Sequence, residues 1–473
     1  MGIQREKEER IIKMKKIEKS SIFISGGYFC ICVIILFLIH YINDITIYPY
    51  DAGTYWDLGY QFGVNKFSFT NYSYGLRGYL LPFLHYILIK LASIGIGTER
   101  INLWIFHSIL YTFTFFILFP RLIEKWFNRK IDYKVRGIFI FICMYFFKGL
   151  ILYPLSDLPA FTFFLIAFYL FVLLLEEKQS YSILVKSLYG IIIGIFLAGA
   201  YYVRPVYLIG IVGFMIVAGY FMIRKKKYVL LYSLIGMIMI AVPQVMINHI
   251  HFHTYSPLIQ TETAYKGKSL YLQQLNWGIM VQKYETNLDL QTYESPSMSF
   301  EDKVGQKLLN KNGIFTGYYN YIKFVILHIG DVGCIYLKHL FNGLDITYND
   351  AYIYNLNKNR FFIQLFNYTF IFLGIKGSVF YFRKKYWNVE KIAILVLYFL
   401  PILLVIPTAV ETRFFIGLHM LLYFLGCMVL MDSNWKELIH KNKIKKFIAY
   451  IIFLAICFLL NSQTFNCFGI SLW

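Results

Sequence analysis

The sequence predicts an all-α polytopic membrane protein with about eleven transmembrane helices, and three observations indicate this class. Of the 473 residues, 58% are hydrophobic and only 15% are charged, against about 25% charged residues in a soluble domain. Apolar runs repeatedly reach roughly 20 residues, the length that crosses a bilayer. The net charge of +20 arises from short basic tracts between these runs, a membrane pattern rather than the basic face of a nucleic-acid-binding domain. We therefore expect membrane lipids, and no nucleic acid, as partners.

The first predicted span is the apolar run 21–41, which follows the basic segment 1–20. This run is too long for a signal-peptide core and lacks a small-residue cleavage site, so we expect an uncleaved span. The basic segment favours a cytoplasmic N-terminus, and the chain after Ile42 then emerges on the extracytoplasmic face. The sequence thus predicts a multi-pass protein of the cell membrane.

Ten further apolar runs complete the predicted set of spans. They cover residues 102–119, 137–153, 158–175, 188–203, 205–222, 228–247, 361–380, 391–408, 414–431 and 447–461. Counting each run as one crossing places every basic tract between them, such as Arg121–Arg136, in the cytoplasm. The short connections around Pro154, Arg204 and Glu411 then point outward.

Two apolar runs are left out of this count. Including Tyr79–Ile96 as a span would invert the topology after it, and Lys90 would lie at an energetically unfavourable depth. The run Tyr319–Leu340 is interrupted by Asp331 and Lys338. We expect both runs to form interfacial or re-entrant helices within two long outer loops.

These predictions divide the chain after its N-terminal segment into three parts. An N-terminal transmembrane module covers 21–247 and includes the first outer loop, 43–100. The second outer loop region covers 248–360, and a C-terminal transmembrane module covers 361–473.

Charged residues from several segments are predicted to gather at the outer membrane surface. In the first outer loop, Pro49 and Gly53 favour a defined turn over a continuing helix. Asp51 and Asp57 then lie just above the bilayer, where solvated loop acids would be the simplest explanation. Further charged residues return to the same level from other segments. They are Arg77, Arg100, Lys148, Asp157, Arg204, Glu411 and Arg413.

Arginine in short outer connections opposes the positive-inside bias, so Arg204 and Arg413 suggest a specific anionic partner. The alternative is simple pairing, of Arg413 with Glu411 and of Arg204 with Asp157. A carboxylate can act as general base on an acceptor hydroxyl, while Arg and Lys bind a phosphate and stabilise the charge of a leaving group. A lipid phosphate in the outer leaflet presents its head group at this level. The set as a whole therefore predicts group transfer from a lipid-phosphate carrier.

Four sequence features match one family of membrane enzymes. Asp51 lies in an outer loop soon after the first span, and the segment Gly78–Pro82 leads into an interfacial helix that closes before Arg100. Arg204 is followed by proline, and Glu411–Phe414 reads Glu-x-Arg-Phe. On these features, and over most of its length, the chain resembles the GT-C glycosyltransferases that use polyprenyl-phosphate-linked sugars. This is the group of the protein O-mannosyltransferases and the lipid A aminoarabinose transferase.

The resemblance implies inverting, metal-independent transfer of a sugar from a polyprenyl phosphate to a cell-envelope acceptor, which is a glycan, a lipid or a protein. It implies Asp51 as the catalytic base. The residues implied to hold the donor phosphate are Arg204, Lys148, Arg413 and Arg100. Those implied to bind substrate are Asp57, Tyr55, Arg77, Asp157 and Glu411.

The resemblance also implies neither a metal nor another cofactor, because the first outer loop lacks the Asp-x-Asp or Asp-Glu pair of the metal-dependent branch. Only Pro82 stands where the O-mannosyltransferases have a pair of prolines, which leaves the acceptor class open.

Other functions remain open. A polysaccharide polymerase or ligase acting on lipid-linked repeat units would also need outer arginines, but in large later loops. A flippase or transporter of lipid-linked sugars would show two related halves with broken spans, and the sequence has no such repeat. A membrane O-acyltransferase needs a catalytic histidine, whereas His107 lies in the second predicted span, where core histidines are common. His249, His251 and His253 could bind a metal on a strand, although solvated side chains are the more common explanation.

Overall fold

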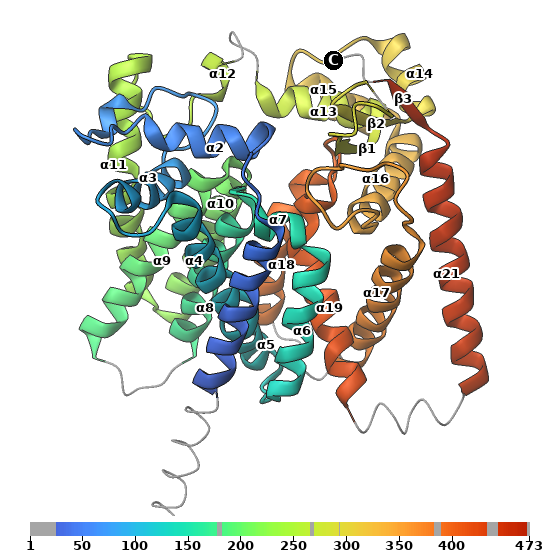
Figure 1. The fold of residues 1–473 in the computed structure, drawn as a ribbon, viewed down its shortest axis with the longest axis horizontal. Coiled ribbons are helices and arrows are strands. Elements are labelled where there is room, and N and C mark those ends of the chain that lie inside the picture. The colour runs from blue at the N-terminus through green and yellow to red at the C-terminus, as the bar shows by residue number, and fades with distance from the viewer. Residues whose placement is uncertain are drawn as a thin grey trace, which may run out of the picture.

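The computed structural model describes residues 25–176, 182–264, 269–292, 294–382, 389–432 and 443–470. The predicted basic segment 1–20 lies outside these ranges. Long helices run side by side through the molecule, and shorter helices with a small sheet cover one end of them (Figure 1). We call the shorter helices and the sheet the cap, and this end of the bundle the cap end.

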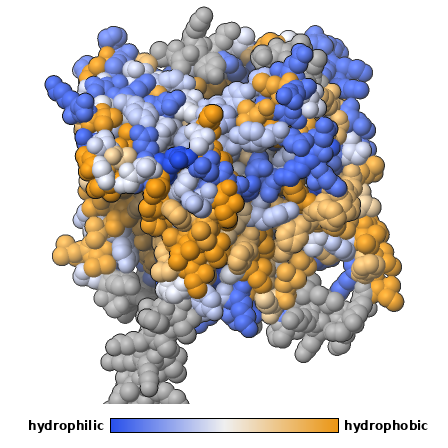
Figure 2. Space-filling view, viewed as in Figure 1, coloured by the Kyte–Doolittle hydropathy of each residue, from blue (hydrophilic) through white to orange (hydrophobic). Residues whose placement is uncertain are grey.

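Within the described ranges, nine helices are long and apolar enough to cross a membrane, which confirms a polytopic membrane protein. They are Ser25–Asn43, Glu99–Phe127, Asp157–Leu175 (α8), Ile183–Val203 (α9), Pro205–Lys225, Tyr228–Phe252, Phe361–Tyr381 (α17), Thr412–Met431 and Ile444–Phe465. Several of these contain more than one element. The elements are α4 (Glu99–Thr112), η2 (Phe113–Leu118), α5 (Phe119–Phe127), η3 (Pro205–Tyr207), α10 (Leu208–Lys225), η4 (Tyr228–Leu231), α11 (Tyr232–Phe252), η6 (Thr412–Phe415), α19 (Ile416–Met431) and α21 (Lys443–Phe465). Hydrophobic surface covers the flank of the bundle and hydrophilic surface gathers on the cap (Figure 2).

The two remaining predicted spans are present as shorter helices. They are α18 (Val389–Val405) and α6 (Tyr133–Phe146), which is followed by α7 (Lys148–Leu152). The break between α6 and α7 lies where another segment passes close to the chain. A Cβ on Gly149 would lie 1.9 Å from the backbone nitrogen of Ala351, and the amide of Gly149 donates to the carbonyl of Asn349 at 3.0 Å. The two segments can therefore pass this closely only because residue 149 is a glycine.

Ion pairs join the connections at the end of the bundle opposite the cap. Arg129 Nη1 lies 2.7 Å from Asp432 Oδ2, and Lys225 Nζ lies 2.8 Å from Glu390 Oε1. These residues belong to the basic connections that the sequence assigns to one side of the membrane. The described residues of these connections lie at one end of the bundle, away from the cap (Figure 1).

The cap contains the segments that were predicted to lie along the interface. Its helices are α2 (Tyr50–Tyr60), α3 (Leu80–Ser93), α12 (Thr261–Ala264), α13 (Leu270–Met280), α14 (Lys303–Asn312), α15 (Tyr318–Leu327) and α16 (Ile329–Leu344). In α3, Lys90 Nζ donates to the carbonyl of Val64 at 2.7 Å, which stabilises a cation in an otherwise apolar helix. Helices α15 and α16 are bent by 102° relative to each other, so the predicted run 319–340 is not one straight span.

The start of α2 differs from the turn that the sequence predicted. The helix begins at Tyr50, directly after Pro49, whose backbone is extended at φ −81° and ψ 157°. Gly53 lies inside the helix, so the prediction of a turn there was wrong. A Cβ at Gly53 would lie 2.4 Å from the carbonyl oxygen of Tyr48. The glycine thus permits a close approach of the preceding chain, which a pattern of turn residues does not reveal.

A three-stranded antiparallel sheet in the cap was not foreseen by the all-α prediction. Its strands are β1 (Val281–Thr286), β2 (Ser297–Glu301) and β3 (Phe468–Ile470), in the order β1-β2-β3. Phe300 of β2 is fully buried, and its ring contacts that of Phe465 edge to face at 5.0 Å between centroids. The sheet therefore fastens the second outer loop region to the end of α21.

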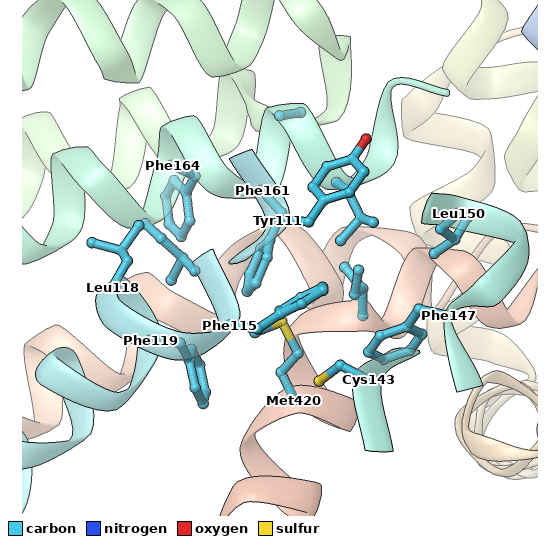
Figure 3. Close-up of a cluster of buried hydrophobic side chains, with 14 of the residues drawn as sticks. Tyr111, Phe115, Leu118, Phe119, Cys143, Phe147, Leu150, Phe161, Phe164 and Met420 are labelled. Carbon is cyan, nitrogen blue, oxygen red and sulfur yellow. The ribbon is translucent and has the colours of Figure 1, made fainter. Parts of the chain in front are cut away.

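Aromatic side chains fill the interior of the bundle. Phe115, Phe119 and Phe139 are fully buried, and the rings of Phe119 and Phe139 stack with centroids 5.5 Å apart. Phe139 meets Phe424 of α19 edge to face at 4.8 Å. Figure 3 shows Phe115 and Phe119 in this core together with Met420 of α19. This packing of α4–α6 against α19 fixes the helix ends from which the candidate site is built.

Candidate functional site

Six charged side chains meet at the cap end of the bundle. They are Asp51 of α2, Arg77 before α3, Asp157 at the start of α8, Arg204 before η3, Glu411 before η6 and Arg413 in η6. We call these residues the charged cluster. All six are among the residues that the sequence predicts for the site. Ion pairs link them, so five segments that are distant in the sequence contribute to one site.

Asp51 is held between two guanidinium groups. Arg77 Nη2 lies 2.6 Å from Asp51 Oδ1, and Arg413 Nη2 lies 3.2 Å from Asp51 Oδ2. Asp51 also lies in the first turn of α2, where the helix dipole favours a negative charge. Its side chain is 34% exposed, against 2% for Asp157 and 14% for Glu411. Asp51 is therefore the acid of the charged cluster that a substrate reaches most easily.

The protonation of Asp51 follows from the same contacts. Burial by itself raises the pKa of this carboxyl, but Arg77, Arg413 and Arg204 together hold the pKa below its ordinary value. Asp51 is therefore a carboxylate at neutral pH and able to accept a hydrogen bond or a proton.

Arg413 connects the three acids. Besides Asp51, its guanidinium lies 3.2 Å from Glu411 Oε1 through Nη2 and 3.8 Å from Asp157 Oδ2 through Nη1. Its Nε donates to the second oxygen of Glu411. Arg413 is thus the hub of the charged cluster, and a fixed fork of donors is what a guanidinium provides for several carboxylates at once.

Arg204 is held by the buried carboxylate of Asp157. Its Nη1 donates to Asp157 Oδ1 and lies 3.4 Å from the hydroxyl of Ser156. The guanidinium carbons of Arg204 and Arg413 lie 4.8 and 5.6 Å from the ring centroid of Phe414. One aromatic ring therefore contacts both cations through cation–π interactions. Asp157, the buried acid, pairs with both of these arginines.

The three acids and three arginines leave the charged cluster without net charge. The pairing of Arg204 with Asp157 and of Arg413 with Glu411, one of the two predicted interpretations, is what the structure contains. Burial raises the pKa of Glu411, and Arg413 opposes this effect. An anion entering the cluster must compete with a carboxylate, and Glu411 takes up a proton more readily than Asp51, whose pKa is lowered.

A small cavity of about 30 Å³ opens beside Asp157, Arg204 and Arg413. The rest of its wall is largely apolar and comes from α8, η3, α18, η6 and α19. It includes Phe161, Phe164, Tyr207, Tyr398, Ile402 and Gly417. This volume holds about one or two water molecules. A sugar must therefore bind on the exposed side of the charged cluster, where Asp51 lies.

The structure brings Tyr55 to the charged cluster but places three other predicted residues elsewhere. The Tyr55 hydroxyl accepts a hydrogen bond from Arg77 Nη1 at 3.1 Å. Arg100 Nη1 pairs with Asp44 at 2.7 Å, and Lys148 Nζ lies 3.8 Å from Asp350.

Asp57 lines a separate pocket together with Arg100. Across the described ranges, none of these three residues forms a hydrogen bond or ion pair with the charged cluster. Asp57 lies away from the charged cluster because the helical period turns it away from Asp51. Arg100 lies in the first turn of α4, beside the same pocket.

Tyr352 belongs to the site, although no sequence pattern had selected it. Its side chain is only 2% exposed, and its hydroxyl accepts a hydrogen bond from the backbone amide of Ala52 at 3.1 Å. Its ring meets that of Tyr153 edge to face at 4.8 Å. The amide of Ala52 also donates to the carbonyl of Pro49 at 3.1 Å, so the Tyr352 hydroxyl is its second acceptor. Tyr352 therefore holds the helix turn that carries Asp51.

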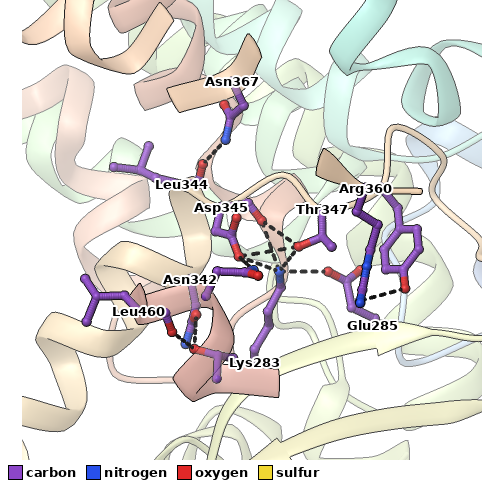
Figure 4. A network of polar contacts seen from close by, with 12 residues as sticks. Lys283, Glu285, Asn342, Leu344, Asp345, Thr347, Arg360, Asn367 and Leu460 are labelled. Carbon is purple, nitrogen blue, oxygen red and sulfur yellow. Dashed lines mark hydrogen bonds and ion pairs between the residues drawn. The ribbon is translucent and has the colours of Figure 1, made fainter. Parts of the chain in front are cut away.

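A second buried polar network lies beneath the sheet and was also missed (Figure 4). Lys283 is fully buried, and its Nζ lies 3.0 Å from the carbonyl of Asp345, 2.9 Å from Thr347 Oγ1 and 3.4 Å from Glu285 Oε1. The Asp345 carboxylate accepts hydrogen bonds from Tyr368 at 2.7 Å and Asn461 at 2.6 Å. The network therefore joins β1 to the end of α16, to α17 and to α21.

The second network also stabilises the charged cluster through the backbone. The amide of Tyr284, between Lys283 and Glu285, donates to the carbonyl of Val410 at 2.8 Å. Val410 directly precedes Glu411. The segment that carries Glu411 and Arg413 is thus fixed on one side by β1 and on the other by α19. The burial of Lys283 in the second network depends on partners that are distant in the sequence, and these partners cannot be recognised from the polar segment around Lys283 alone.

Among the described residues, no group of three or more His, Cys, Asp or Glu side chains is arranged to hold a metal ion. The three acids of the charged cluster are separated by guanidinium groups. His251 Nε2 lies 2.7 Å from the carbonyl of Thr70, and the three predicted histidines follow the helix α11 or its end rather than a strand.

These features define a polytopic membrane protein with a charged site at the cap end of its helix bundle. Comparison of the chain with protein-family models, with characterised proteins and with solved structures finds no match.

Proposed function

We propose that the protein is a membrane glycosyltransferase that moves a sugar from a polyprenyl phosphate to an acceptor hydroxyl of the cell envelope. The observation that carries this proposal is the position of Asp51. Asp51 is an accessible carboxylate, 34% exposed, and it forms an ion pair with Arg413. The guanidinium groups of Arg413 and Arg204 both contact the ring of Phe414. A proton acceptor thus stands beside two cations that can bind a leaving phosphate.

In this mechanism the acceptor oxygen forms a bond to the anomeric carbon of the sugar. The bond between that carbon and the phosphate oxygen breaks, and its electron pair leaves with the polyprenyl phosphate. The acceptor proton passes to Asp51 and then to solvent. Arg204 and Arg413 stabilise the negative charge that develops on the departing phosphate. Attack from the face opposite the leaving group inverts the anomeric configuration, and the step uses no metal.

Binding of the donor phosphate adds negative charge to a cluster that is balanced without it. Glu411 can offset this addition by taking up a proton, because burial raises its pKa. Its protonation would free one side of Arg413 for the phosphate. Asp51, whose pKa is lowered, stays ionised and remains able to accept the proton.

The proposed orientation places the cap outside the cell and the N-terminus in the cytoplasm. Arg129 and Lys225, from two of the basic connections, lie at the end of the bundle opposite the cap, and basic connections favour the cytoplasmic side. The charged cluster then lies at the extracytoplasmic surface of the cell membrane, at the level of lipid head groups. A polyprenyl phosphate reaches this level without leaving the bilayer.

The proposal is tested with the full chain purified into lipid nanodiscs. A panel of polyprenyl-phosphate sugars is supplied together with crude envelope extract as a source of acceptor, and the release of free polyprenyl phosphate is measured. Wild type is expected to release it, and Asp51→Asn to lose the activity while keeping its fold. Asp331→Asn, on the exposed side of α16, serves as the matched control. Absence of release from every donor by wild type would overturn the proposal.

A further inference from the structure

A second pocket lies beside α2 and is separate from the charged cluster. Its volume is about 320 Å³, which is at the lower end of the range for small-molecule sites. The pocket is lined by Thr46, Ile47, Tyr48, Gly53, Trp56, Asp57, Glu99 and Arg100. These residues come from the chain after the first long helix, from α2 and from the start of α4. We call this space the aromatic pocket.

The helical period of α2 places the two sites on different sides of one helix. Asp51 and Tyr55 are separated by four residues and face the arginines of the charged cluster. Gly53, Trp56 and Asp57 have spacings of three and four residues, and all three line the aromatic pocket. The width of one helix, about 10–12 Å, therefore separates the sites. A short oligosaccharide can extend over this distance.

The wall of the aromatic pocket includes two aromatic side chains and an unused hydroxyl. The rings of Tyr48 and Trp56 meet edge to face at 5.7 Å. The Tyr48 hydroxyl is buried and forms no hydrogen bond with any part of the chain that the structure describes. Burial raises the pKa of Tyr48 to about 12, so the group stays a neutral donor. Buried hydroxyl groups are normally hydrogen-bonded, so we expect a water molecule or a ligand in the aromatic pocket, which Tyr48 lines, to pair with this one.

The charges of the aromatic pocket exclude an anionic ligand. Asp57 and Glu99 line it, while the one cation, Arg100, is already paired with Asp44 at 2.7 Å. Glu99 accepts a hydrogen bond from Tyr60 at 2.5 Å and retains capacity for more. A phosphate or a uronic acid would meet a surplus of negative charge here. An uncharged ligand with several hydroxyl groups and apolar C–H faces would meet acceptors, a donor and aromatic rings.

From these observations we infer that the aromatic pocket binds an uncharged sugar ring of the acceptor. The inference rests on the proposed function and makes the acceptor a glycan. One ring lies in the aromatic pocket, and a neighbouring unit presents its reactive hydroxyl to Asp51 on the other side of α2. Transfer then extends or decorates an oligosaccharide of at least a few units rather than a single small molecule.

Binding is tested without any donor, on an array of neutral, amino-substituted and uronate-containing oligosaccharides, with labelled protein in nanodiscs. Neutral glycans are expected to bind and uronate-containing glycans to be rejected. Tyr48→Phe removes only the unpaired hydroxyl, so it should keep the thermal stability of wild type and weaken glycan binding by roughly three- to tenfold, the worth of one hydrogen bond. Asp57→Ala should weaken binding further. Tyr319→Phe, whose side chain is 78% exposed on α15, is the matched control.

The outcomes separate this inference from the proposed function. Asp51→Asn should bind neutral glycans as wild type does, because Asp51 lies outside the aromatic pocket. Glycan binding that survives both Tyr48→Phe and Asp57→Ala, or that favours uronates, would overturn the inference. The same holds if no glycan binds while polyprenyl phosphate is still released. Glycan binding that responds to both variants supports the inference, and if it occurs without any release from a donor, only the proposed reaction fails.

Discussion

Arg413 Nη2 lies 3.2 Å from Asp51 Oδ2, although 362 residues separate the two in the sequence. This contact joins the C-terminal transmembrane module to the first outer loop. Because Arg413 also contacts Glu411 and Asp157, its position determines the distance between the accessible acid and the buried one. The charged cluster is therefore a property of the folded bundle and not of any local motif.

Removing Arg413 should unfold the cap end as well as abolish transfer. Arg413→Ala leaves Asp157 and Glu411 buried without their main partner, which destabilises a protein by about 3–5 kcal/mol. Arg413→Lys keeps the charge but loses the fork of donors, and should recover part of the stability. Chemical unfolding in detergent measures both variants. Equal stability of Arg413→Ala and wild type would contradict the role of Arg413 as hub.

Replacing Gly149 should separate the segment that carries Tyr352 from α7. A Cβ at this position would lie 1.9 Å from the backbone nitrogen of Ala351, and backbone atoms give way poorly. Gly149→Ala should therefore destabilise the protein by about 1–3 kcal/mol. Gly137→Ala on α6 is the matched control, because nothing lies within 4 Å of its Cβ, and it should be neutral or stabilising. Similar melting temperatures for the two variants would refute this account of the α6–α7 break.

Tyr352→Phe should slow transfer without weakening substrate binding. The variant keeps the ring against Tyr153 and removes only the oxygen that accepts the Ala52 amide. The first turn of α2 then loses a partner, and Asp51 is held less firmly. We expect kcat to fall about tenfold or less while KM stays unchanged, as for a positioning residue. A change confined to KM would instead make Tyr352 a substrate contact.

The buried network at β1 should make stability depend on pH through Glu285. Burial raises the pKa of Glu285 above its ordinary value of 4.5, against the opposing effect of Lys283. In the pH range just above that value, the folded state binds more protons at this group than the unfolded state does. The contribution of Glu285 to the free energy of unfolding must therefore fall as pH rises through this range.

Glu285→Gln should remove that contribution. The difference in unfolding free energy between wild type and Glu285→Gln, followed from about pH 5 to pH 8, should move in favour of the variant as pH rises. Glu301→Gln, at the end of the neighbouring strand β2, provides a control acid. A difference that is independent of pH, or that moves in favour of wild type, would contradict the raised pKa.

The sequence predicted the helices well and the contacts between them in part. Apolar runs located each long helix because spanning length and composition are local properties. Counting each apolar run as one crossing predicted that Asp51, Asp157, Arg204 and Arg413 lie at the same end of the bundle. The structure confirms this. The crossing count did not predict that Arg413 is the hub of the charged cluster, because the position of Arg413 depends on how α19 packs.

What the sequence could not predict depends on long-range partners. Lys283 lies in a polar segment and resembles a solvated cation, but it is buried because Asp345, 62 residues later, compensates its charge. The third strand, β3, follows α21 and pairs with β2 of the second outer loop region, and its short sequence carries no strand pattern. Gly53 was interpreted as a turn residue, whereas its role is to admit the Tyr48 carbonyl next to α2.

The release of polyprenyl phosphate by wild type and by Asp51→Asn tests the central claim most directly. If Asp51 accepts the proton of the acceptor, the variant should release polyprenyl phosphate at least about a hundredfold more slowly and unfold at the temperature of wild type. Release by Asp51→Asn at the rate of wild type would contradict the role of Asp51. Absence of release by wild type from every polyprenyl-phosphate sugar would contradict the transferase itself.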